Sequence, residues 1–136
     1  MKLRFLIVDD NAHFLTVASD LLEREGVSVV GAASTGAEAV RAADELRPDV
    51  ALVDIDLGGE SGFDVAQRLA SVPNGARPRV VLISTYAEHD FADMIASSPA
   101  EGFVSKSSLS AQAIYDVLGI EGDSDSDSDG DGTEPG

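Results

Sequence analysis

The sequence predicts a single α/β domain, a doubly wound five-stranded parallel sheet with helices on both faces. Five short apolar runs alternate with stretches of helical periodicity over the first 118 residues. The runs are almost continuously apolar, which is typical of parallel strands that are buried on both faces. Glycine and proline residues separate the alternating stretches, as expected at turns between strands and helices.

The five strands are expected near residues 3–8, 27–31, 49–54, 79–84 and 101–104. Between them, apolar residues recur at the spacing that buries one face of a helix. In the first helix these residues are Phe14, Val17, Ala18, Leu21 and Leu22. The later helices are centred on residues 39–46, 65–70, 91–95 (with Met94 on the apolar stripe) and 113–118. Right-handed crossovers leave few arrangements, and the flavodoxin-like strand order 2-1-3-4-5 fits, with the first strand beside the third.

The helix boundaries also have local signals. Capping-box spacing marks two helix starts, at Thr35–Glu38 and at Ser61–Asp64. Gly26 follows the first helix, and Pro48 and Pro99 follow the second and fourth. These residues end helices because glycine adopts left-handed backbone geometry and proline cannot continue the hydrogen-bond ladder.

Carboxylates end the first and third predicted strands. Asp9 and Asp10 close the first run, and Asp54 closes the third. Because the carboxyl ends of neighbouring parallel strands meet at one edge of the sheet, the three acids are expected in one crevice. Three close carboxylates repel one another unless a cation lies among them. The pattern therefore predicts a divalent metal ion at this position. We expect Mg²⁺, which Mn²⁺ could replace.

Two later strands end in groups that suit phosphate chemistry. Ser84 supplies a hydroxyl and Lys106 an amine, and both are expected to contact phosphoryl oxygens. Asp54 can attack a phosphorus centre and hold the phosphoryl group as an acyl phosphate. Three glycines that follow it allow a tight loop: Gly58, Gly59 and Gly62.

Residues 1–118 resemble the receiver domain of bacterial two-component response regulators. The resemblance implies that Asp54 is the phosphoacceptor and that Asp9 and Asp10 are metal ligands, together with Asp54 and the backbone carbonyl of Asp56. It also implies three roles at the later strand ends: Ser84 as the switch hydroxyl, Lys106 as the lysine of the family motif, and Phe103 as the switch aromatic.

The resemblance implies a signalling protein rather than an enzyme, one that catalyses only its own metal-dependent phosphorylation and dephosphorylation. A sensor histidine kinase or a phosphotransfer protein would give its phosphoryl group to Asp54. Phe103 would then turn inward behind Ser84, and the fourth and fifth β-α units would rearrange. The changed surface would bind a downstream protein or a second copy of the chain in a phosphorylation-dependent homodimer.

The net charge of −16 is spread over the whole chain. Residues 119–136 form an Asp/Ser/Gly-rich segment with seven acids and no base, so a disordered acidic tail is expected there. Within it, Asp125–Gly130 has the spacing of half an EF-hand loop. The twelfth position is Gly136, so we interpret the tail as a solubilising extension. Residues 1–118 show no basic stripe, and direct nucleic-acid binding is not expected.

Targeting signals are lacking as well. No apolar run reaches the roughly 20 residues of a membrane span. The first apolar run ends in two acids rather than in a cleavage site for a secretion signal. We therefore expect a cytoplasmic protein that does not associate with membranes.

Two alternative functions compete with this interpretation. Haloacid-dehalogenase-like phosphatases also use an Asp-x-Asp motif, which Asp54–Asp56 matches. Their metal-binding acids follow the lysine, however, whereas Asp9 and Asp10 precede Lys106. Among signalling functions we expect a stand-alone regulator, because the acidic tail ending in Gly136 resembles a natural terminus. The alternative is the receiver portion of a DNA-binding transcriptional response regulator whose output domain is absent from this chain.

Overall fold

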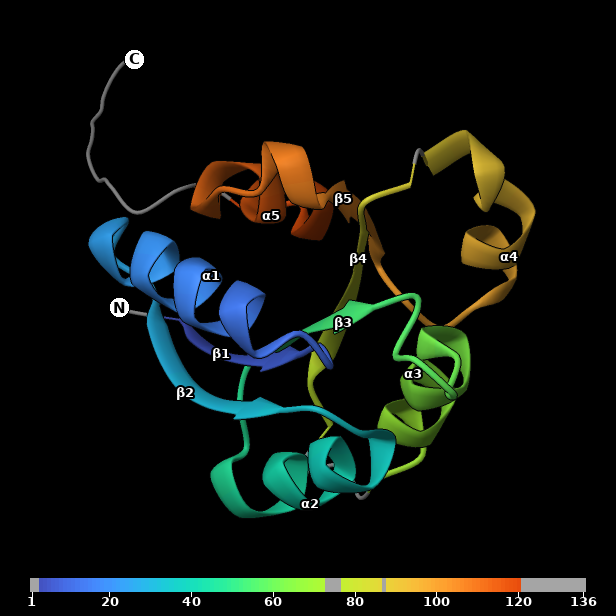
Figure 1. Ribbon diagram of the computed structural model, residues 1–136, viewed down its shortest axis with the longest axis horizontal. Coiled ribbons are helices and arrows are strands. Elements are labelled where there is room, and N and C mark those ends of the chain that lie inside the picture. The colour runs from blue at the N-terminus through green and yellow to red at the C-terminus, as the bar shows by residue number, and fades with distance from the viewer. Residues whose placement is uncertain (1–2, 73–76, 87, 121–136) are drawn as a thin grey trace.

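The computed structural model describes residues 3–72, 77–86 and 88–120. They form a parallel sheet between two layers of helices (Figure 1). The strands are β1 (Arg4–Val8), β2 (Ser28–Ala33), β3 (Val50–Asp54), β4 (Arg79–Ser84) and β5 (Gly102–Ser105). Their order is β2-β1-β3-β4-β5, which confirms the predicted fold class and topology. The predicted acidic tail lies outside the described residues from residue 121 onward.

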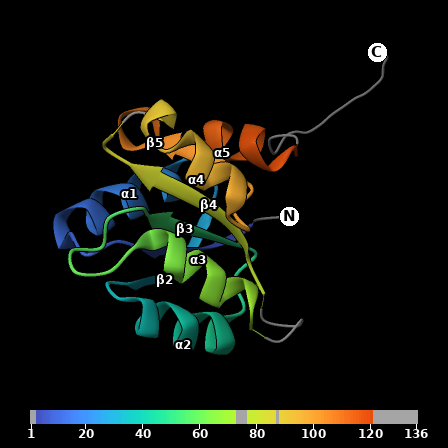
Figure 2. The same cartoon turned by 90° about the vertical axis from the view of Figure 1, so that its right-hand side faces the viewer.

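Helices connect the strands on both faces of the sheet (Figures 1 and 2). The α-helices are α1 (Ala12–Arg24), α2 (Gly36–Leu46), α3 (Gly62–Ala70), α4 (Ala92–Ser97) and α5 (Ala111–Leu118). Two 3₁₀ helices are η2 (Glu88–Asp90) and η3 (Lys106–Ser108). Helices α1 and α5 cover one face, and α2, α3 and α4 cover the other. Among the described residues, no helix combines the length and the apolar character that a membrane crossing requires.

Each face of the sheet has its own apolar cluster. Phe5 and Ile7 of β1 belong to the cluster under α1 and α5, whereas Leu6 and Val8 belong to the cluster under α2 and α3. Successive side chains of a strand point to opposite faces, so a strand covered on both sides must be apolar at every position. All four side chains are fully buried, which stabilises the fold by about 1.5–3 kcal/mol each.

The predicted N-cap residues Thr35 and Ser61 both cap their helices, but each predicted capping box differs in one partner. The Thr35 hydroxyl accepts the N–H of Glu38 at 3.1 Å, as expected at the start of α2. The Glu38 carboxylate accepts the N–H and the hydroxyl of Ser34 rather than the N–H of Thr35. These hydrogen bonds lower the pKa of Glu38. At the start of α3, the Ser61 hydroxyl accepts the N–H of Phe63.

Candidate functional site

The strand register brings the carboxyl ends of β1 and β3 together. Val8 pairs with Val53, so Asp9 and Asp54 follow neighbouring backbone positions. Carboxylate oxygens of Asp9, Asp10 and Asp54 all lie within 4.8 Å of one another. Asp9 and Asp54 are buried and Asp10 is exposed. The predicted acid cluster is therefore present, and Asp10 lies on its solvent side.

Lys106 reaches this cluster from the end of β5. Its Nζ lies 2.6 Å from Asp9 Oδ2 and 3.0 Å from Asp54 Oδ2. Burial alone would lower the pKa of Lys106, but the bonds to Asp9 and Asp54 outweigh burial, and the pKa is raised. The ammonium is therefore charged at neutral pH and links the ends of three strands.

Each carboxylate oxygen of Asp54 has its own donor. Oδ1 accepts the N–H of Asp56 at 3.1 Å, and Oδ2 accepts the Lys106 ammonium. Burial raises the pKa of Asp54, and the charge of Asp9 adds to that effect, while both hydrogen bonds oppose it. The net shift is upward. The two donors thus fix the orientation of this carboxylate, but they do not fully offset its burial beside another acid.

The acid cluster has the ligand chemistry of a divalent cation site. Of the three clustered carboxylates, those of Asp9 and Asp54 contact the Lys106 ammonium. Asp9 Oδ1 accepts the N–H of Asn11 at 2.9 Å, but the buried Oδ2 only contacts Lys106, without a well-aligned hydrogen bond. Carboxylate oxygens of three acids that lie within 4.8 Å of one another suit a hard cation that prefers oxygen ligands.

The loop after β3 needs glycine at two positions, for different reasons. Gly58 has a φ of +78°, which side chains rarely adopt. Gly62 packs directly on the phosphoacceptor candidate, since a Cβ there would lie 2.0 Å from the backbone oxygen of Asp54. At Gly59, by contrast, a Cβ would meet no atom within 4 Å, and the φ is not left-handed. Two of the three predicted loop glycines are therefore required by geometry.

Ser84 and Phe103 lie at the ends of β4 and β5. Ser84 is buried, and its hydroxyl accepts the N–H of Tyr86 at 3.0 Å. It pairs with Ser105, the residue before Lys106. Phe103 is 8% exposed and belongs to the cluster under α2 and α3. Its ring therefore lies inward, and the predicted movement stays a prediction.

Phe14 is a site residue that the sequence interpretation missed. Periodicity assigned it to the apolar stripe of the first helix, and it does pack against the cluster under α1 and α5. Its ring also lies beside the Lys106 ammonium, with 4.2 Å between the ring centroid and Nζ. Its position on the first turn of the helix after Asp9 and Asp10 was the only sequence signal of this contact.

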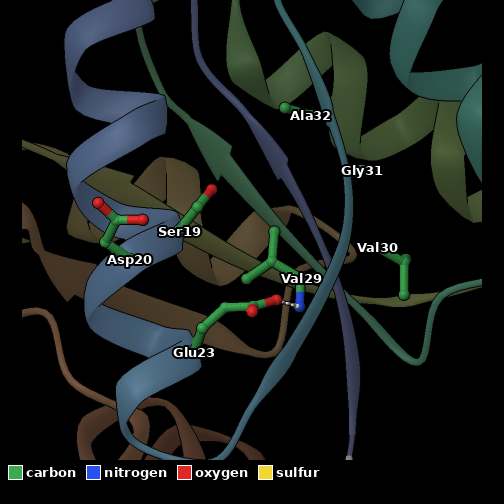
Figure 3. Close-up of a pocket in the computed structure, with 7 residues that line it drawn as sticks. All are labelled: Ser19, Asp20, Glu23, Val29, Val30, Gly31 and Ala32. Carbon is green, nitrogen blue, oxygen red and sulfur yellow. Dashed lines mark hydrogen bonds between the residues drawn. The ribbon is translucent and has the colours of Figure 1, made fainter.

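A separate hollow of about 300 Å³ lies between α1 and the edge strand β2 (Figure 3). Ser19, Asp20 and Glu23 face it from the helix, and the Glu23 carboxylate accepts the N–H of Val29. The residues that line it include none of those predicted to carry phosphate chemistry. The candidate site is thus the acid cluster and not this hollow.

Fold and site together define a class of protein: a doubly wound α/β domain with an acid cluster and a lysine at the switch point of its sheet. The family model described as the response regulator receiver domain matches residues 5–118. The chain belongs to this family, which confirms the resemblance. It is a family of signal receivers rather than of enzymes that turn over a separate substrate.

Individual relatives agree with this assignment. Over 120 residues the chain is 35% identical to protein-glutamate methylesterase/protein-glutamine glutaminase 5 of Myxococcus xanthus, covering 86% of this chain and 34% of the relative. The chain spans about a third to a half of the length of the first curated relatives it matches.

Solved structures are similar as well. The signal receiver domain of the NarL response regulator from Mycobacterium tuberculosis has a TM-score of 0.73 and 32% identity, covering 87% of this chain and 94% of that one. A response regulator from Burkholderia pseudomallei has a TM-score of 0.71 and 25% identity, covering 85% of this chain and 65% of that one. That structure contains a phosphorylated aspartic acid, a calcium ion and citrate.

Proposed function

We propose that this chain is a phosphorylation-switched response regulator that accepts a phosphoryl group on Asp54 from a histidine kinase or a phosphotransfer protein. The observation that carries the proposal is the position of Lys106, whose ammonium contacts both Asp9 and Asp54. It holds a positive charge beside the carboxylate that would carry the phosphoryl oxygens. The phosphorylated aspartic acid of the related Burkholderia structure supports the same chemistry.

The residues present fit a magnesium ion, with manganese as a substitute. Its ligands would be the carboxylates of Asp9, Asp10 and Asp54 and the backbone carbonyl of Asp56. Bound metal would supply positive charge to the phosphoryl oxygens and offset the repulsion among the acids. The structural support for this ligand set is the position of the three carboxylates, whose ligand oxygens lie within 4.8 Å of one another.

Transfer requires one bond to form and one to break. A carboxylate oxygen of Asp54 attacks the phosphorus of the donor's phosphohistidine, and the P–N bond breaks as the O–P bond forms. The imidazole nitrogen keeps the electron pair and takes a proton from solvent. Lys106, which donates to Asp54 Oδ2 at 3.0 Å, would donate to a phosphoryl oxygen of the product. The product carries a charge of about −2 near pH 7.

The new charge would act on the end of β4. Because the Ser84 hydroxyl accepts the N–H of Tyr86, its own proton can be donated to a phosphoryl oxygen. The Tyr86 ring packs edge-on against Phe91, with centroids 6.0 Å apart, and Phe91 contacts Phe63 at 6.2 Å. Movement of Ser84 would therefore disturb a contact between the β4–α4 connection and α3.

The consequence we propose is a changed surface on α4, β5 and α5, with Phe103 holding the inward position. Phosphorylation can bias only states that the phosphoryl group contacts differently, so the surface change is a population shift. A downstream protein, or a second copy of this chain, would bind the favoured state. The kinase, the target and the cytoplasmic location stay predictions.

A stand-alone regulator that acts by protein–protein contact is the form we favour. The alternative is the receiver portion of a DNA-binding transcriptional response regulator. It is supported by the length of the curated relatives, of which this chain spans about a third to a half. The mass of the protein isolated from its native source distinguishes the two, since an output domain would add to the mass of this chain.

Incubation with acetyl phosphate and Mg²⁺, followed by mass spectrometry, tests the phosphoacceptor. We expect the mass gain of one phosphoryl group in the wild type, and no gain in Asp54→Asn or after chelation of the metal. A folded wild type that is phosphorylated neither by acetyl phosphate nor by histidine kinases would contradict the proposal. The phosphorylated residue itself is identified by reduction of the acyl phosphate with borohydride and peptide sequencing.

A further inference from the structure

The Lys106 ammonium has a third neighbour besides the two carboxylates. The Phe14 ring lies with its centroid 4.2 Å from Nζ, well inside the roughly 6 Å range of a cation–π interaction. The Lys106 side chain is only 13% exposed. Because little water competes at such a site, the attraction between cation and ring is stronger than at an exposed position.

We propose that Phe14 is a positioning residue for the phosphorylation of Asp54, which acts by holding the Lys106 ammonium against Asp9 and Asp54. This inference rests on the proposed function, because it assigns Phe14 a part in the same reaction.

The chemistry of the ammonium explains why an aromatic ring suits this place. Lys106 has three N–H donors and no acceptor. The ammonium donates a hydrogen bond to Asp54 Oδ2 and lies 2.6 Å from Asp9 Oδ2, and the Phe14 ring contacts it as well. The ring attracts the cation through its quadrupole but has no lone pair that competes with a phosphoryl oxygen. A water or a carboxylate in its place would be a competing acceptor.

The backbone around Phe14 is tied to the acid cluster. Asn11 donates its N–H to Asp9 Oδ1 at 2.9 Å, and its side chain accepts the N–H of Phe14 at 3.1 Å. The ring of Phe14 contacts the Lys106 ammonium, and this ammonium contacts Asp9 Oδ2. These contacts form a closed circuit of four residues. A displacement of the ring is therefore transmitted to the lysine and not to the helix alone.

The test replaces Phe14 site-specifically with phenylalanines that carry one, two or three fluorine atoms. Fluorination weakens the cation-binding face of the ring while it changes the shape little. We expect the rate of Asp54 phosphorylation by acetyl phosphate and Mg²⁺ to fall stepwise, by about threefold to tenfold over the series. The phosphorylation rate of Phe14→Leu should be as low as that of the trifluorinated protein, and the rate of Phe14→Tyr should stay near that of the wild type.

A second measurement reports on the contact itself. The ε-methylene protons of Lys106 lie near the ring, so their NMR signals should be shifted upfield in the wild type and in Phe14→Tyr. In Phe14→Leu that shift should be lost. Leu15→Ala is the matched control, because Leu15 packs against the same apolar cluster from the neighbouring position of α1. It should lower stability and leave both the rate of the folded protein and the Lys106 signals unchanged.

The outcomes separate this inference from the proposed function. If the wild type is phosphorylated but the phosphorylation rate does not change across the fluorinated series, the role of Phe14 is overturned and the proposed function is not. Lys106 signals that do not respond to Phe14→Leu would overturn it as well. A wild type that is never phosphorylated on Asp54 would overturn the proposed function, and the role of Phe14 with it.

Discussion

Gly62 is the position where one methyl group should disturb the site most. In Gly62→Ala, the new Cβ would lie 2.0 Å from the Asp54 carbonyl oxygen, 2.7 Å from Ile55 Cα and 2.8 Å from the Asp54 carbonyl carbon. All three are backbone atoms, so no side chain can rotate away. Real Cβ atoms essentially never approach closer than 3.0 Å, so the backbone at Asp54 or the start of α3 must move by about 1 Å.

The size of the effect follows from two opposing terms. Overpacking against backbone should cost about 3 kcal/mol, and alanine should return less than the roughly 1 kcal/mol of a helix interior, because Gly62 is the first residue of α3. We therefore expect Gly62→Ala to lower the free energy of unfolding by about 2 to 3 kcal/mol. A 1 Å displacement of the attacking carboxylate should also slow the phosphorylation of Asp54 by about 10- to 100-fold.

Urea unfolding measures the first effect, and the rate of phosphorylation by acetyl phosphate under folding conditions measures the second. Gly59→Ala in the same loop is the control, since its Cβ would meet no atom within 4 Å and its φ is not left-handed. It should be neutral or stabilising by about 0.5 kcal/mol. If both variants proved equally stable and equally reactive, the close approach of Gly62 to Asp54 would be refuted.

Two further predictions concern metal and pH. Mg²⁺ at about 100 times its Kd should raise the free energy of unfolding of the wild type by about 2.7 kcal/mol, and that of Asp9→Asn by much less. Urea unfolding with and without a chelator measures this, and equal stabilisation of both proteins would exclude Asp9 as a ligand. Glu38 has a lowered pKa, so its contribution to stability is present above the ordinary value of 4.5 and is lost as the pH falls through the lowered pKa. The stability difference between the wild type and Glu38→Gln should therefore shrink in acid, and a difference that is constant with pH would contradict the role of this carboxylate.

Much of the fold could be predicted because strand packing constrains the sequence directly. Residues 79–84 are predicted and observed as a strand. The second strand was predicted to end at residue 31, but β2 continues to Ala33, where it pairs with Val8. Gly31, Ala32 and Ala33 have low β propensity, and pairing with β1 overrides that preference. Around Val30 the register shifts, which no local pattern indicates.

Helical periodicity predicted the positions of the helices well. It predicted less well which of their residues are buried. Val17 and Met94 continue the apolar stripes of their helices, yet their exposed fractions are 48% and 52%. The prediction that both are buried is wrong. Helix α4 has only six residues, and none of them is buried. Periodicity identifies a face of a helix, but the width of the face that is covered depends on the neighbouring elements.

In the candidate site, too, some contacts could be predicted from the sequence and others could not. The meeting of Asp9 with Asp54 follows from the adjacency of β1 and β3, which strand order alone predicts. Strand order alone does not predict that Lys106 contacts Asp54. Strand β4 separates β5 from β3, and neighbouring strands are about 4.8 Å apart. Lys106 is the first residue of η3, immediately after β5, and its Nζ reaches Asp54 Oδ2 at 3.0 Å.

The contacts that the sequence could not reveal are the ones that orient the reacting groups. Gly62 sets the position of the Asp54 backbone, and Phe14 lies against the ammonium of Lys106. Both depend on distances between elements, whereas the acids are recognisable from their place at strand ends. A chain could therefore retain all of its acids and the lysine and still react slowly. Combining Gly62→Ala with Phe14→Leu tests this directly: because Lys106 donates a hydrogen bond to Asp54, both residues act on one contact, and the combined effect on the phosphorylation rate should differ from the product of the two single effects.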